Sequence, residues 1–312
     1  MIRSRRPDPP LRRLGPRLSR RGLITSGVLA GVLAVSGVPV AARGRGGVLR
    51  LALAGPVPAG RGDWDTRRAS LAGLAAGLVA ETLTEIGTQG ELLPGLAAAW
   101  ESDGAARDWR LVLTPGARFH DGRPVAPSDV VPSLGRHREG SPLSWLLARV
   151  EEARADGPGA VRLRLREGDP DLPLRLADPR LVVWRGGRPD GVGSGLYRLD
   201  PDAPPGVLRA LREPSHRRDG QAGFFAAVEA RALPDPQARL RALLAGDADA
   251  ADPLPPALEA EALAAGLALA PAEGPRAPVA RTPHVPGLAH GPVSGLRPLD
   301  GGRIAERWWF AA

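Results

Sequence analysis

The chain has 312 residues, of which 43% are hydrophobic, so it can bury a proper core in one large or two modest domains. The formal charge is +8, but residues 1–42 hold eight Arg and one Asp, which leaves only +1 for the remainder. A nearly neutral body excludes phosphate-backbone binding, and nucleic acid with it, because such binding depends on clustered Lys and Arg. The absence of Cys excludes disulfides, thiolate metal sites and a lipid-modified cysteine.

Residues 1–42 are typical of a signal peptide that is cleaved after Ala42. The pair Arg20–Arg21 precedes an uncharged stretch that ends in two small residues. Twin arginines indicate the twin-arginine export route. The glycines and the proline of this stretch make it weakly apolar for a membrane span of about 20 residues. The sequence therefore predicts a free exported protein, and a retained membrane anchor is the alternative.

Two elements are predicted near the start of the mature chain. Residues 48–54 alternate Leu with smaller or polar residues, which is the period-2 pattern of a strand. From Ser70 to Ile86 the apolar residues recur at spacings of three and four, and Gly87 follows where a helix C-cap is expected. This second pattern predicts a helix.

The run from Leu92 to Val131 predicts a hairpin, a tight turn and the start of a helix. Trp109, Leu111 and Leu113 fall on one side of the second strand of the hairpin. The turn is Phe119–Gly122, in which Asp and Gly accept backbone angles that most residues refuse. We interpret its His and Asp as turn residues, because no other metal ligand or catalytic partner falls at a suitable spacing nearby.

The helix after this turn is predicted to be short or kinked. Ala126 occupies the N-cap position, where it offers no oxygen, and Pro127 is harmless at the first helical position. Pro132 lies where a helical N–H should donate, a change that costs about 3 kcal/mol in a helix interior.

Three further segments carry clear patterns. Val161–Arg166 alternates apolar residues with Arg, which predicts a half-buried strand with a solvated Arg stripe. Gly191–Leu199 contains three alternate glycines that allow close approach of the backbone to a ligand or to another strand, and it contains neither a phosphate loop nor a nucleophile elbow. Asp235–Gly246 predicts a capped helix with Pro236 in its first turn and a buried face formed by three leucines, Leu240, Leu243 and Leu244.

The hairpin run and the helix 235–246, in this order, resemble the first lobe of the dipeptide, oligopeptide and nickel solute-binding proteins of bacterial ABC importers (family 5). The shared motifs are P-x-L-A-x-x-W, F-H-D-G-x-P and the helix that ends in Gly-Asp-Ala-Asp. The resemblance covers roughly residues 48–275. It implies an α/β fold of the type II periplasmic binding protein class, with a mixed sheet and flanking helices.

The resemblance is incomplete at its C-terminal end. In full-length relatives a second α/β lobe follows and encloses the ligand, but only residues 276–312 remain here, and an independent domain needs about 50 residues or more. The expected organisation is therefore a signal peptide (1–42), a first lobe (43–275) and a loop-rich tail (276–312) that packs on the lobe, with the second lobe missing or vestigial. The family's Asn-Pro-x-Tyr-Trp is replaced by residues 213–217, so that both aromatics are lost.

The resemblance implies a periplasmic solute-binding component that captures a peptide, a nickel-type chelate or a related small molecule and delivers it to an ABC permease and ATPase. It implies no enzymatic activity and no cofactor, and it implies membrane contact only through the permease. By analogy the ligand-binding candidates near the cleft are Asp63, Trp64, Asp65, Trp145, Gly193, Ser194 and Gly195. The alternative is a single-lobe remnant that acts as an interaction module or has lost transport function, and a hydrolase ranks last because no nucleophile–base constellation is visible.

Overall fold

The computed structural model describes residues 46–58, 64–67, 78–86, 92–219, 225–252 and 254–267. The predicted signal peptide, Asp63, residues 70–77 of the predicted helix 70–86 and the tail 276–312 lie outside these residues. Within them the chain forms an α/β fold with three sheets and short helices. None of the helices in the described ranges is long and apolar enough to cross a membrane.

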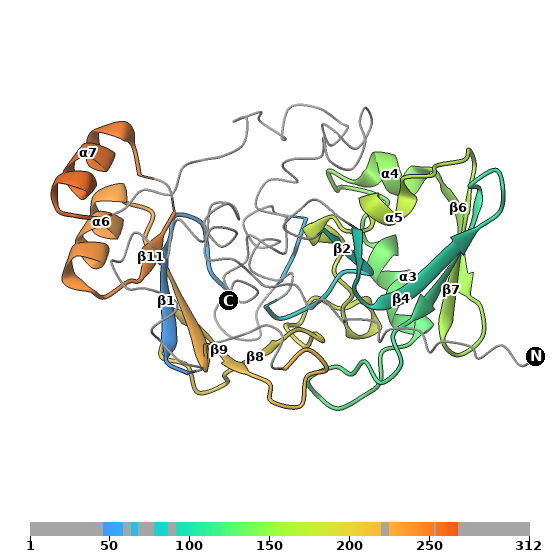
Figure 1. Cartoon of the computed structure of the whole chain (residues 1–312), viewed down its shortest axis with the longest axis horizontal. Helices are drawn as coiled ribbons and strands as arrows, with labels where there is room; N and C mark the ends of the chain where they lie inside the picture. The colour runs from blue at the N-terminus through green and yellow to red at the C-terminus, as the bar shows by residue number, and fades with distance from the viewer. Residues whose placement is uncertain are drawn as a thin grey trace, which may run out of the picture.

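Two larger sheets organise the fold (Figure 1). The first has the strand order β11-β1-β10-β9-β8, in which β1 runs parallel to β10 and β11 and the other pairs are antiparallel. Its strands are β1 (Val48–Leu53), β8 (Tyr197–Leu199), β9 (Val207–Arg212), β10 (Ala227–Ala232) and β11 (Ala250–Ala251). The predicted strand 48–54 is therefore confirmed as β1, and it lies inside a mixed sheet.

The second sheet is entirely antiparallel, with the order β4-β5-β7-β6. Its strands are β4 (Ala97–Ser102), β5 (Asp108–Leu113), β6 (Val150–Ala155) and β7 (Ala160–Leu165). The predicted hairpin is confirmed as β4–β5, and Trp109, Leu111 and Leu113 are buried on one face as their spacing predicts. On the other face Arg162 and Arg164 of β7 pair with Asp108 and Glu151, so these two members of the predicted Arg stripe are solvated and neutralised.

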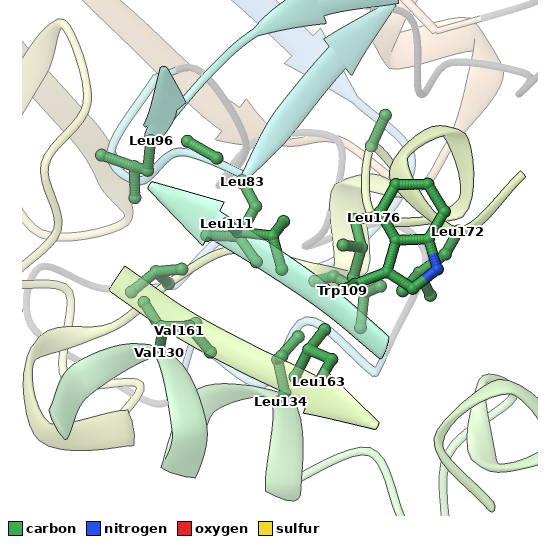
Figure 2. Close-up of a cluster of buried hydrophobic side chains, with 14 of the residues drawn as sticks. Leu83, Leu96, Trp109, Leu111, Val130, Leu134, Val161, Leu163, Leu172 and Leu176 are labelled. Atoms are coloured by element: carbon green, nitrogen blue, oxygen red, sulfur yellow. The ribbon is translucent and has the colours of Figure 1, made fainter. Parts of the chain in front are cut away.

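One core lies between the second sheet and the helices beside it. Helix α3 (Pro127–Gly135) contacts β6 and β7, and the short helices α4 (Ser144–Ala148) and α5 (Leu172–Arg175) close the same side. Figure 2 shows apolar side chains of β5 and β7 meeting those of α3 and α5. The members labelled there are Leu83, Leu96, Trp109, Leu111, Val130, Leu134, Val161, Leu163, Leu172 and Leu176.

A second core lies against the first sheet. Residues 181–184 join the two cores, because alternate side chains of an extended segment point to opposite faces. Leu181 and Val183 are buried in the first core, whereas Val182 and Trp184 are buried in the second. Val183 pairs with Glu81 in an antiparallel bridge. The two halves of the described chain therefore share a buried central segment.

The helix predicted over 70–86 is wrong for its described part. Residues 78–86 are buried throughout, and Thr84–Ile86 forms strand β2, which pairs with β3 (Leu92–Pro94) in a small antiparallel sheet. A segment that is buried on every side shows no polar face, so spacings of three and four between its apolar residues do not identify a helix. The β-branched Thr82, Thr84 and Ile86 fit a strand better.

Helix α3 shows how the chain tolerates the weak N-cap that the sequence predicts. Ala126 supplies no side-chain cap, but the Asp129 carboxylate accepts hydrogen bonds from the Ala126 N–H (2.9 Å) and the Gly186 N–H (2.7 Å). Arg123 also pairs with Asp129. The helix contains Pro132 and spans only nine residues, so the prediction of a short helix is confirmed.

The second predicted helix, α6 (Pro236–Ala245), is confirmed with both of its caps. Asp235 accepts hydrogen bonds from the N–H groups of Gln237 and Ala238, and Gly246 has the left-handed φ of 74° that ends the helix. Helix α7 (Pro256–Ala264) packs beside it, at the outer end of the first sheet (Figure 1). Leu240 is buried as predicted, but Leu244 is 47% exposed, so the predicted face was too wide.

The exposed large hydrophobic residues of the described chain are Leu244 and Leu263, which is 55% exposed. Both belong to the helix pair α6–α7. Among the described residues these two side chains do not make a broad apolar face.

Candidate functional site

The loop of residues 64–67 holds two of the predicted ligand contacts, Trp64 and Asp65. Trp64 is completely buried, and its ring centroid lies 6.3 Å from that of Trp184. Its backbone N–H donates to the Pro189 carbonyl (3.1 Å). The Asp65 carboxylate accepts two 2.8 Å hydrogen bonds from the Arg67 guanidinium, which hold the pKa of Asp65 below its usual range. Trp64 is thus placed for packing, and its burial gives no support to ligand contact.

Trp145 lies on the other core. It is half-buried on α4, and the Arg175 guanidinium lies 5.7 Å from its ring centroid. Trp64 and Trp145 therefore belong to different cores. Trp64 does lie next to the glycine segment, since a Cβ added at Gly191 would be 2.9 Å from its Nε1. The structure brings part of the predicted set together and leaves Trp145 apart.

The segment Gly193–Gly195 makes the close approach that its glycines predict, and the partner is the chain itself. A Cβ added at Gly193 would lie 2.0 Å from the Val79 carbonyl oxygen, and one at Gly195 would lie 2.4 Å from that of Leu78. The Gly195 N–H donates to Val79 and the Tyr197 N–H to Leu78, both at 2.9 Å. These glycines therefore serve strand-like pairing inside the lobe.

All three carbonyls of this segment accept hydrogen bonds from histidine residues. His120 donates its backbone N–H to Gly193 (2.9 Å) and its Nε2–H to Gly195 (2.9 Å), and His216 donates its Nε2–H to Ser194 (3.0 Å). A carbonyl oxygen only accepts, so each Nε2 carries the hydrogen. In this structure the three carbonyls are not free to pair with an extended ligand.

The turn around His120 is confirmed as a structural feature. Gly122 has a φ of 86° and donates its N–H to the Phe119 carbonyl (2.8 Å). Burial lowers the pKa of His120 below its usual value, so the ring is neutral at pH 7. Its Nδ1 is buried and has no hydrogen-bond partner.

A buried ion-pair cluster, which we call the Glu81–Arg217 cluster, fastens the segment 213–218 to the centre of the lobe. The Arg217 guanidinium binds both oxygens of Glu81, at 2.7 and 2.6 Å, and Arg218 binds Glu85 at 2.6 Å. Burial alone would raise the pKa of Glu81, but Arg217 and His216 outweigh burial and hold that pKa well below its usual range. Glu81 therefore stays charged in the interior because it has a cation, and Arg218 places a cation beside Glu85 as well.

Sequence reasoning missed this cluster. Residues 213–217 stood out only for their lost aromatics, and the partners are far apart along the chain. A usable signal was present: Glu81 and Glu85 interrupt an apolar stretch, and a buried carboxylate requires a positive partner.

A pocket of about 110 Å³ lies between the turn 116–122 and the segment 213–217. Its polar lining comes from six side chains, Arg118, His120, Glu213, Ser215, His216 and Arg217. Hydrogen bonds from Ser215 lower the pKa of Glu213, and Arg198 lies 3.6 Å from it. In the described ranges no three His, Asp or Glu residues are grouped so that they could hold a metal ion. The arrangement has the character of a small polar binding surface.

A family model for bacterial extracellular solute-binding proteins, family 5 (middle region), matches residues 91–282, well over half of the chain. The chain belongs to this family. A curated relative, the uncharacterized protein YhjP of Bacillus subtilis, is 35% identical over 105 residues, which is 32% of this chain and 18% of YhjP. The family assignment confirms the resemblance drawn from the hairpin and from helix α6.

Solved structures of family 5 type show the same fold. The periplasmic binding protein AgaA from A. tumefaciens R10, in complex with agropinic acid, superposes with a TM-score of 0.57 at 22% identity, over 65% of this chain and 43% of AgaA. OppA from Haemophilus influenzae, in complex with the peptide RPPGFSPFR, gives 0.59 at 18% identity, over 69% and 48%. The chain therefore has the type II periplasmic binding protein fold, and it spans less than half of either solved chain.

Proposed function

We propose that this chain captures a peptide or a related small solute outside the cytoplasm and passes it to the permease and ATPase of an ABC importer. The observation that carries the proposal is the family match over residues 91–282, which spans the hairpin, α3 and α6 in a fold of the type II class. Solute binding is what this family does. The solute, its delivery and the transporter partners are the parts that we propose.

The proposed contacts are the candidates that the family resemblance implies. Asp63, which lies outside the described residues, and Asp65 would meet the amino end of a peptide, and Trp145 would contact an apolar side chain. Trp64 and the segment Gly193–Gly195 would shape the wall behind the solute, because they are buried and paired within the lobe.

A thermal-shift screen of residues 43–312 tests the proposal. The probes are di- to pentapeptides and a nickel–histidine chelate. A ligand at 100 times its Kd stabilises the native state by about 2.7 kcal/mol. For a domain of this size that stabilisation raises Tm by roughly 5–10 °C. No shift with any probe at millimolar concentration would contradict solute capture.

A matched pair of variants tests the role of Trp145. Trp145 and Trp100 are both partly buried against the first core, but only Trp145 is a proposed contact. We expect Trp145→Ala to reduce the ligand-induced rise in Tm and Trp100→Ala to preserve it, each measured against the ligand-free Tm of the same variant. An equal reduction of the ligand-induced rise in Tm in both variants would show that Trp145 is not a ligand contact.

The export route is also a proposal, supported by the leader 1–42. Replacement of Arg20 and Arg21 by Lys should retain a folded reporter fusion in the cytoplasm, because the twin-arginine route depends on this pair. Export of the Lys–Lys fusion at the normal rate would contradict that route and leave solute binding unaffected.

A further inference from the structure

Two histidines from distant segments fasten the same short stretch of backbone. His120 stands on the turn 116–122, His216 stands on the segment 213–218, and their Nε2–H groups donate to the adjacent residues Gly195 and Ser194. The pocket of about 110 Å³ lies between the two segments. Both hydrogen bonds require that each ring carries its single hydrogen on Nε2. We call the arrangement with both bonds formed the closed state.

Neither ring has an acceptor for a second hydrogen. The His120 Nδ1 is buried without a hydrogen-bond partner. The His216 Nδ1 already accepts the Arg218 N–H at 3.1 Å. Protonation of His120 would add an N–H to its Nδ1, which would leave a buried donor unpaired.

From this geometry we propose a latch in which His120 and His216 hold the turn 116–122 and the segment 213–218 on Gly193–Gly195 at neutral pH, and in which His120 is the acid-sensitive element that releases them as the pH falls. This device is independent of the solute proposed above. It concerns the opening of two segments, and it holds whether or not a peptide binds.

The charged groups around His120 have opposing effects on the protonation of its ring. Glu213 and Glu81 face His120 and favour its protonated form, whereas His216 and the burial of the ring disfavour it. Glu81 also lies 3.7 Å from the His216 Nε2, but its two oxygens are held by Arg217. Arg118, on the rim of the pocket, adds positive charge on the same side.

The balance at His120 favours the neutral ring, since its pKa is lowered. A histidine whose pKa is lowered in the closed state stabilises that state fully above its unfolded pKa of about 6.5. This stabilisation is lost as the pH falls below that pKa. The latch is therefore expected to be closed at pH 7.5 and weakened at pH 5.5.

Hydrogen–deuterium exchange of residues 43–312 at pH 7.5 and pH 5.5, corrected for intrinsic exchange rates, tests the latch. Peptides that cover 116–125, 191–199 and 213–219 should open up to about tenfold more readily at pH 5.5, when the His120 ring can be protonated. Peptides from β5 and β7 serve as the internal reference and should change less. An equal change in the reference strands would mean general acid unfolding and would overturn the proposal.

The variant His120→Gln isolates the histidine. Its amide N–H can still donate to Gly195, but it does not titrate, so the pH response of the three peptides should shrink. An unchanged response would contradict the proposal. The matched control is His137→Asn, which removes a buried histidine that bonds to Ser141 and does not contact Gly193–Gly195, and which should leave the local response intact.

A measurement on the unmodified chain covers the case in which the Gln variant does not fold. Long-range ¹⁵N–¹H spectra report the protonation of each histidine nitrogen, and we expect His120 to keep its hydrogen on Nε2 for as long as the His120 and Gly195 amides stay protected. A His120 ring that becomes doubly protonated near pH 6.5 while these amides remain protected would overturn the latch.

Discussion

The Glu81–Arg217 cluster makes a quantitative prediction about stability. Arg217→Met removes the cation that binds both oxygens of Glu81, a carboxylate whose side chain is only 2% exposed. Breaking a buried pair from one side costs about 3–5 kcal/mol, because a charge is left uncompensated in the interior. For a domain of this size the loss lowers Tm by roughly 6–20 °C.

A double-mutant cycle monitored by urea unfolding measures this effect. We expect Glu81→Gln to be destabilising as well, and the double variant to cost roughly 1–3 kcal/mol less than the sum of the two single variants. Arg164→Met is the matched control, since Arg164 pairs with Glu151 at 3.4 Å on the surface, with 60% and 46% of the two side chains exposed. An exposed pair is worth about 0–1 kcal/mol. Equal costs for Arg217→Met and Arg164→Met, or strict additivity in the cycle, would refute the reasoning.

Three further predictions follow from local geometry. Gly193→Ala should destabilise the lobe by about 3 kcal/mol or more, because its Cβ would meet the Val79 carbonyl at 2.0 Å, whereas Gly159→Ala, which has open space around it, should stay within about 0.5 kcal/mol in the same urea assay. Ala126→Ser should stabilise α3 by about 0.5–2 kcal/mol, since Ala126 already has an extended N-cap conformation, and a lower unfolding midpoint would contradict this expectation. Burial lowers the pKa of His137 from 6.5 to about 4, so the unfolded chain binds the proton first and stability falls between pH 6.5 and 4 by roughly 3 kcal/mol. His137→Asn should reduce that pH dependence, and an unchanged slope of unfolding free energy against pH would count against this assignment.

Local patterns predicted the elements whose burial is one-sided. In β5 the alternation of Trp109, Leu111 and Leu113 with polar residues reflects one face on a core and one in solvent. Helix α6 was predicted to within its caps because Asp235 and Gly246 act on their own neighbours. Family membership could also be inferred from the sequence, because its motifs lie in these two regions.

The central part of the fold could not be predicted in this way. Residues 78–86 are buried between two cores, so neither the helix period nor the strand period marks a solvent-facing side. The sequence therefore predicts a helix where residues 84–86 form strand β2. Trp64 is a predicted ligand contact, and its packing beside Trp184, a residue far away in the sequence, is visible only in the structure. The ion pairs of Glu81 and Glu85 with Arg217 and Arg218 likewise depend on tertiary packing.

Equilibrium dialysis tests solute capture most directly. Residues 43–312 are dialysed against a mixed pool of di- to pentapeptides, and the peptides retained with the protein are identified by mass spectrometry. We expect a restricted set of peptides to be enriched, with saturation near one peptide per chain. Retained peptides that match the composition and concentration of the pool outside would contradict solute capture by this lobe.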